Sequence, residues 1–214
     1  MVRYISFDLD GTLANNDFDY MVWNEEIPRL YARIHRVPYE DARTRVFAEY
    51  YKVMHLEKPA RMSDISYWFE RLKLGDFTQL VEDMKRNNFV YEDTKETLQY
   101  LHDKGYKLIV VSNADEKFLK AKTEAEGISE FFEHRFSAPT SFGHAKKNRD
   151  VFEKVLATIG VAPHEMVHVG DDHHYDVEVP GTLGISGYFL VRGNKPMAPD
   201  ANNIPSLREL KDKF

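Results

Sequence analysis

The sequence RYISFDLDGT, from Arg3 to Thr12, joins an apolar run to an acidic turn. Its first five residues are mostly β-branched or aromatic, which is typical of a buried strand, and Gly11 marks a turn directly after it. Residues two apart in an extended segment share a face, so Asp8 and Asp10 are expected to point into one site. Two close carboxylates repel each other, and Mg²⁺, which prefers oxygen ligands, would relieve that repulsion. A surface Asp-x-Asp turn is the alternative interpretation.

The segment that follows has a different character, because its apolar residues recur at helical spacing and strand patterns are missing from it. One such helical face is formed by Val46, Tyr50, Val53 and Met54. Two prolines and a glycine divide the segment into about four helices: Pro38, Pro59 and Gly75. We therefore expect an all-helical insertion over residues 16–91, set between the two parts of a core domain, residues 1–15 and 92–214.

From Tyr91 onward, strand and helix patterns alternate. Continuous apolar strands are expected at residues 107–112, 166–171 and 187–191, and helices at 149–159 and from Ser206. Residues 93–96 (DTKE) resemble a capping box that opens a further helix. Apolar strands separated by helices indicate a parallel sheet covered on both faces, which is an α/β, Rossmann-like core. Ligands of such sheets bind beyond the carboxyl ends of the strands.

Polar residues stand where that rule would place a site. Ser112 and Asn113 end the second apolar strand and offer a hydroxyl group, an amide and backbone N–H groups, which suit an anion; a helix N-cap is the alternative. Lys146 and Lys147 precede the helix that starts at Arg149, where a lysine is usually just solvated.

A third polar group, GDDHHYD, places Asp171, Asp172 and Asp176 after the strand that begins at Met166. A calcium loop is a competing interpretation, but the EF-hand spacing and its final glutamate are missing. The adjacent His173 and His174 suggest zinc less well, since the sequence shows no third nitrogen or sulfur ligand in register.

The composition excludes several classes of protein. The formal charge over 214 residues is −6, and the basic residues form no stripe, so we expect no nucleic-acid partner. Cysteine is absent, which rules out disulfides and thiolate metal sites. No apolar stretch approaches the roughly 18 residues of a membrane span, so we expect no membrane partner and a cytoplasmic location. The expected assembly is a monomer or a homodimer.

Taken together and in this order, the polar groups resemble the motifs of the haloacid dehalogenase superfamily. The first motif of that superfamily, D-x-D-G-T, is matched in full, and its second is a Ser or Thr at the end of an apolar strand. Its third motif, K-P-x-P-x-x-F, aligns Lys146 with Phe152 but lacks the prolines, and its fourth is G-D-x-x-x-x-D. The matching positions are Asp8 to Thr12, Ser112, Lys146, Gly170, Asp171 and Asp176. A helical insertion between the first two motifs is where this superfamily carries its C1 cap.

The resemblance implies a role for each position. Asp8 would be the nucleophile that forms an aspartyl-phosphate. Asp10 would bind the metal through its backbone carbonyl and act as general acid and base through its side chain. The Mg²⁺ ligands would be Asp8, Asp10 and Asp171, and the phosphate-binding residues would be Gly11, Thr12, Ser112, Asn113 and Lys146. Asp176 would orient Lys146 or a metal-bound water, and Asp172 could do the latter.

The resemblance further implies a Mg²⁺-dependent phosphohydrolase that acts on a small phosphorylated metabolite. Dehalogenases of the superfamily lack an acid at the position of Asp10 and need no metal, so Asp10 favours phosphate chemistry. A phosphomutase shares all the core motifs and remains open, as does a non-catalytic phosphate-binding module.

Overall fold

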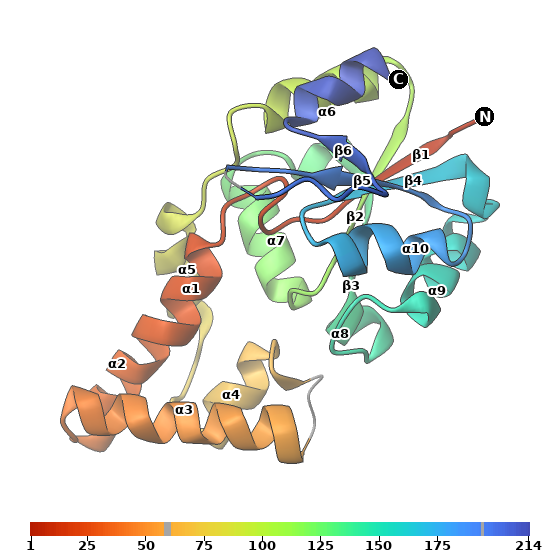
Figure 1. The fold of residues 1–214 in the computed structure, drawn as a ribbon. Helices are drawn as coiled ribbons and strands as arrows, with labels where there is room; N and C mark the ends of the chain where they lie inside the picture. Colours follow the sequence, from red (N-terminus) through yellow and green to blue (C-terminus); the bar gives the residue numbers. More distant parts are fainter. Residues whose placement is uncertain (58–60, 194) are drawn as a thin grey trace.

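A six-stranded sheet forms the centre of the molecule (Figure 1). The computed structural model describes residues 1–57, 61–193 and 195–214. The strands run in the order β3-β2-β1-β4-β5-β6, and every neighbouring pair is parallel. Their bounds are β1 Tyr4–Phe7, β2 Lys107–Ser112, β3 Phe132–Ser137, β4 Met166–Gly170, β5 Ser186–Leu190 and β6 Asn202–Ile204. This is the expected Rossmann-like α/β core.

Helices cover both faces of the sheet because alternate strand residues face opposite sides. Ile5 and Phe7 of β1 belong to the apolar cluster under α6 (Thr94–Asp103), α7 (Glu116–Ala125) and the 3-10 helix Leu207–Asp212. Tyr4 belongs to the cluster on the other face, under α8 (Ala138–Phe142) and α9 (Arg149–Ile159). Shorter helical turns complete the core at Ser129–Phe131, Pro163–Glu165, His174–Glu178 and α10 (Val179–Gly181).

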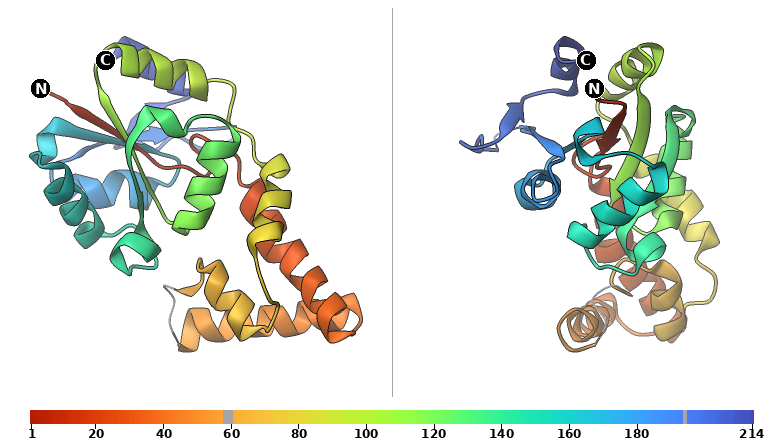
Figure 2. Two further views of the ribbon diagram at one scale, coloured as in Figure 1. Left: turned by 180° about the vertical axis from the view of Figure 1, so that it is seen from behind. Right: turned by 90° about the vertical axis from the view of Figure 1, so that its right-hand side faces the viewer.

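The segment of residues 17–87 is mainly helical in its described part and lies beyond one end of the sheet (Figures 1 and 2). It comprises α1 (Asp17–Met21), a π-helical turn (Val22–Glu26), α2 (Ile27–His35), α3 (Tyr39–Leu56), α4 (Ile65–Arg71), α5 (Thr78–Met84) and a 3-10 turn (Lys85–Asn87). It has its own apolar cluster, to which α7 adds Phe118 and Ala121. Pro59, expected to divide two of these helices, lies outside the described residues.

Two connecting segments join this helical part to the core, and they pair with each other. The amide of Asn15 donates to the carbonyl of Phe89 at 3.1 Å, and the amide of Tyr91 donates to that of Leu13 at 3.0 Å. An antiparallel bridge links Ala14 and Val90 between them. The chain therefore leaves and re-enters the core at one place. No helix in the described part of the chain is long and apolar enough to cross a membrane.

The expected capping box at Asp93 is not formed, although α6 does begin at Thr94. The Asp93 side chain makes no bond to the first turn of the helix. It accepts hydrogen bonds from Arg192, from the hydroxyl of Ser206 at 2.7 Å and from the amide of Leu207 at 2.9 Å. Asp93 is almost fully buried, and there a charge-assisted tertiary bond to Arg192 stabilises the carboxylate more than a helix cap would.

Candidate active site

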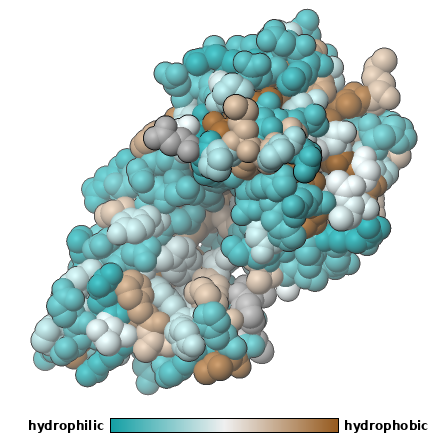
Figure 3. Space-filling view, in the orientation of Figure 1, coloured by the Kyte–Doolittle hydropathy of each residue, from teal (hydrophilic) through white to brown (hydrophobic). Residues whose placement is uncertain are grey.

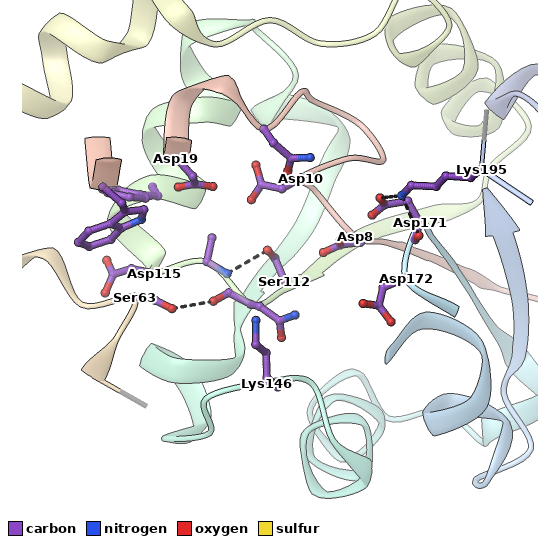
Figure 4. Close-up of a pocket in the computed structure, with 15 residues that line it drawn as sticks. Asp8, Asp10, Asp19, Ser63, Ser112, Asp115, Lys146, Asp171, Asp172 and Lys195 are labelled. Carbon is purple, nitrogen blue, oxygen red and sulfur yellow. Dashed lines mark hydrogen bonds and ion pairs between the residues drawn. The ribbon is translucent and has the colours of Figure 1, made fainter. Parts of the chain in front are cut away.

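A cavity of about 390 Å³ lies at the carboxyl ends of the strands, beside the helical insertion (Figures 3 and 4). The core contributes Asp8, Asp10, Ser112, Asn113, Lys146, Asp171 and Asp172 to its wall. The insertion contributes Asn16, Asp19, Trp23 and Ser63. The structure thus brings to one cavity the polar groups that follow three different strands.

Asp8 stands at the end of β1 and is nearly buried, with 8% of its surface exposed. Its amide continues the sheet by donating to the carbonyl of Val169 at 2.9 Å, which fixes its backbone. Burial raises the pKa of the Asp8 carboxyl to about 7, against the opposing effect of Lys147, whose ammonium lies 2.9 Å from Asp8 Oδ1. The carboxyl group is therefore rigid and desolvated.

The lysine that contacts Asp8 is Lys147. The alignment had placed its neighbour Lys146 in this role, as a phosphate-binding lysine oriented by Asp176. Lys147 is fully buried and also lies 2.5 Å from Asp176 Oδ1, whereas Lys146 is exposed on the cavity wall. The start of α9 determines which lysine turns inward. Asn148 caps this helix, because its side-chain oxygen accepts a hydrogen bond from the amide of Val151. The Lys147 amide is held by Asn113 Oδ1 at 2.7 Å. Burial lowers the pKa of Lys147, but Asp176 and Asp8 outweigh it, and the net pKa is well above the usual range.

Asp176 is fully buried, and its carboxylate forms an ion pair with Lys147. His168 lies 3.0 Å from Asp176 Oδ1, and the amide of Asp172 donates to Asp176 Oδ2 at 2.9 Å. Although burial raises the pKa of Asp176, Lys147 and His168 overcome that effect and hold its pKa far below the usual range. Asp176 therefore serves as a fixed negative charge that keeps Lys147 in place.

An acidic cluster suited to a metal forms beside these residues. Carboxylate oxygens of Asp8, Asp171 and Asp176 lie within 4.8 Å of one another. Gly11 makes this approach possible: it has φ +80°, and a Cβ at that position would lie 2.4 Å from Asp171 Oδ2. Lys195, an exposed side chain, also pairs with Asp171. Asp8 and Asp171 line the cavity, whereas Asp176 is fully buried and does not, so the residues that best fit Mg²⁺ are Asp8 and Asp171.

Asp10 lies in the same cavity, but its carboxylate has separate partners. Lys122 Nζ lies 2.6 Å from Asp10 Oδ1 and 2.5 Å from Asp19 Oδ2. Burial raises the pKa of Asp10 to about 8, with Lys122 opposing and Asp19 adding to the rise. The two carboxyl groups of the first motif therefore stand in different environments, as groups with different tasks require.

Ser112 and Asn113 lie on the cavity wall at the end of β2, as expected. The Ser112 hydroxyl oxygen accepts the amide of Ala114 at 3.1 Å, and Asn113 anchors the Lys147 loop. The carbonyl of Asn113 also accepts the Ser63 hydroxyl at 3.2 Å, which links the insertion to the core (Figure 4).

Gly11 and Thr12, which the resemblance placed at the phosphate, are buried away from the cavity wall. Gly11 packs against Asp171, and Thr12 is fully buried with its carbonyl accepting from Arg192 at 2.7 Å. Within the described part of the chain, the Thr12 hydroxyl has no hydrogen-bond partner. Their position indicates that they shape the turn after Asp10.

Sequence reasoning missed four polar residues of this region: Lys122, Asp19, His168 and Lys195. One signal was available for Lys122, which follows Phe118 by four residues and so shares the apolar face of its helix. A lysine on such a face needs a buried partner. His168, within an apolar strand, gave the same kind of signal.

A parallel α/β fold with paired carboxylates at the end of its first strand places this protein in the class of α/β proteins with an acidic site at the strand ends. The model of the family described as haloacid dehalogenase-like hydrolase matches residues 2–180. The chain belongs to this family, and it is a hydrolase. This confirms the resemblance drawn from the motifs.

Curated relatives and solved structures agree with this placement. The chain is 25% identical over 184 residues to the GMP/IMP nucleotidase YrfG of Escherichia coli, covering 86% of this chain and 80% of that protein. It is 25% identical over 221 residues to a phosphoglycolate phosphatase of Vibrio vulnificus, covering 99% and 95%. The crystal structure of a HAD phosphatase from Thermococcus onnurineus matches with a TM-score of 0.83 over 99% of this chain and 97% of that chain, at 24% identity. The last similarity confirms the fold.

Proposed function

We propose that the protein is a Mg²⁺-dependent phosphohydrolase that acts on a small phosphorylated metabolite through a phosphorylated Asp8. One observation carries the proposal: the two carboxyl groups of the first motif share a cavity but have different cationic partners, Lys147 for Asp8 and Lys122 for Asp10. Paired carboxyl groups that differ in environment are suited to a nucleophile and an acid–base group. Relatives named as phosphatases and as a nucleotidase support the substrate class.

In the first step an Asp8 carboxylate oxygen attacks phosphorus, and the bond from phosphorus to the leaving oxygen breaks. Asp10 gives its proton to that oxygen, so the leaving group departs as an alcohol. In the second step water attacks phosphorus, Asp10 accepts its proton, and the bond between Asp8 and phosphorus breaks. Lys147 remains beside Asp8 and offsets the negative charge of the transferring group throughout.

Mg²⁺ would be held by Asp8, Asp171 and the backbone carbonyl of Asp10. When bound, it would neutralise charge on the phosphoryl oxygens. The carboxylate of Asp10 points toward Lys122 and so takes no part in the acidic cluster of Asp8, Asp171 and Asp176. A backbone ligand at this position leaves that side chain available for proton transfer.

The insertion, residues 16–91, would act as the cap. Its Trp23 and Ser63 line the cavity, and the paired connecting segments at residues 13–15 and 89–91 form its covalent connection to the core at one place. A cap attached at one place can move as a unit and exclude water from the site. The leaving group would meet these cap residues.

A phosphomutase would use the same core residues, and a non-catalytic phosphate-binding module would keep the cavity without turnover. The test is phosphate release from p-nitrophenyl phosphate, with inorganic phosphate and p-nitrophenol both measured. Activity should require Mg²⁺, disappear in EDTA and return with excess Mg²⁺. Full turnover in EDTA, by protein shown to be metal-free, would overturn the proposal.

A further inference from the structure

Lys122 is the one buried cation beside the cavity, within the described chain, that the proposed mechanism does not use. It lies on α7 with its side chain 0% exposed. Its ammonium contacts Asp10 of the core and Asp19 of α1 (Figure 4 shows both carboxylates). The rings of Phe18 and Phe118 lie 5.1 and 5.9 Å from the same nitrogen.

Burial of a lysine is unfavourable unless hydrogen bonds and opposite charges compensate for the lost hydration. Asp10 and Asp19 supply two such charges, and the two aromatic rings supply cation–π contacts. Burial lowers the pKa of Lys122, but Asp10 and Asp19 outweigh it and raise the pKa above its usual value, so the side chain is charged. A charged group packed in this way has few alternative positions.

We propose that Lys122 is a positioning residue for Asp10. Its ammonium holds Oδ1 of the Asp10 carboxyl, so that the other oxygen is turned toward the leaving group. The inference rests on the proposed function, because it assigns Lys122 a role only if Asp10 transfers protons. Asp19, which belongs to the helical insertion, binds the same ammonium and restrains its position when the Asp10 side chain moves.

The geometry explains why position matters here. Asp10 is partly exposed to the cavity, with 18% of its side chain accessible, and its neighbour Asp8 is held independently by Lys147. Without Lys122, the carboxyl group could rotate toward the metal cluster or toward Asp19, and a misplaced catalytic group can lower a rate about 10²-fold.

The experiment compares Lys122→Met with Lys120→Met, a matched control on the exposed face of the same helix. Lys122→Met should lower kcat about 10²-fold while KM changes little, and Lys120→Met should change neither. The loss should be larger with phenyl phosphate than with p-nitrophenyl phosphate, whose leaving group needs less protonation. Lys122→Arg, which retains a cation and N–H donors, should recover part of the rate.

A double-mutant cycle with Asp10→Asn separates positioning from a structural effect. Lys122→Met should cause no further loss of kcat in the Asp10→Asn background. Full additivity, or an equal loss with both substrates, would overturn the inference. If Lys122→Met fails to fold, Lys122→Arg carries the test, and it must lower kcat more with phenyl phosphate than with p-nitrophenyl phosphate. If Asp10→Asn itself retains full kcat with phenyl phosphate, the proposed acid–base role of Asp10 fails instead.

Discussion

The ammonium of Lys147 bridges Asp8 at the end of β1 and Asp176 after β4, at 2.9 and 2.5 Å. Asp176 is held in turn by His168 and by the amide of Asp172. The position of the cation beside the nucleophile is therefore set by two strands and the α9 loop together. Such preorganised charge is the main catalytic contribution of a protein to phosphoryl transfer.

Lys147→Met should reduce kcat by about 10³-fold, because it removes a buried cation from the reacting groups and leaves Asp8 and Asp176 uncompensated. Lys146→Met is the matched control, since the neighbouring side chain is exposed on the cavity wall. We expect it to raise KM while kcat falls by less than about 10-fold, because exposed charges are well screened. Steady-state kinetics with p-nitrophenyl phosphate measures both. If Lys146→Met lowered kcat more than Lys147→Met does, Lys146 would be the catalytic lysine that the motif alignment predicts.

Asp8→Asn and Asp10→Asn should fail in different ways. An amide oxygen is a poor nucleophile, so Asp8→Asn should form no phosphoenzyme. Asp10→Asn should lower turnover by about 10²–10⁴-fold, the usual contribution of an acid–base group, and less with p-nitrophenyl phosphate than with phenyl phosphate. It should also accumulate phosphorylated Asp8, because water attack needs a base. Mass spectrometry of acid-quenched protein detects the adduct, and an adduct on another residue would refute the assignment.

The central strands were predictable because they are buried on both faces and so read as apolar runs. The predicted strand at 107–112 is β2, and the helix at 149–159 is α9. The edge strands were missed: β3 reads FEHRFS and β6 reads NNI. An edge strand is partly exposed, and its polar residues conceal the pattern.

Side-chain partners were less predictable than strands. The motif alignment selected Lys146 by its spacing to Phe152, but the start of α9 decides which of the two adjacent lysines turns inward, and it is Lys147. Likewise, Asp93 occupies a cap position, but its bonds go to Arg192 and Ser206, about one hundred residues away in the chain. Such choices depend on tertiary contacts that no local pattern records.

Asp93 should make the fold sensitive to acid. Burial raises the pKa of its carboxyl, but Arg192, Ser206 and the Leu207 amide outweigh it and lower the pKa. A depressed folded pKa contributes stability above the unfolded value of about 3.9, and that stability is lost as pH falls through the folded pKa. Asp93→Asn should therefore cost about 3 kcal/mol at pH 7 and less below pH 4.

Urea unfolding at several pH values tests this prediction, with Glu92→Gln as the control. Glu92 is the neighbouring residue, and its 86% exposed side chain pairs with Arg208 on the surface. Its substitution should change the free energy of unfolding by less than about 0.5 kcal/mol. Equal effects of the two substitutions at pH 7 would show that the buried pair of Asp93 and Arg192 does not stabilise the core.

Gly11→Ala should impair metal binding more than it impairs folding. Gly11 has φ +80°, which strains any residue with a Cβ, and the added carbon would lie 2.4 Å from Asp171 Oδ2. Gly105 is the matched control, because it has φ +86° and a Cβ added there would meet no atom within 4 Å. Both alanine variants should lose about 1–2 kcal/mol of stability from backbone strain. Only Gly11→Ala should displace Asp171, so the Mg²⁺ concentration for half-maximal activity should rise at least about 10-fold, a loss of roughly 1.4 kcal/mol in binding free energy. If titration with Mg²⁺ gives the same midpoint for both variants, Asp171 is not a ligand of the metal.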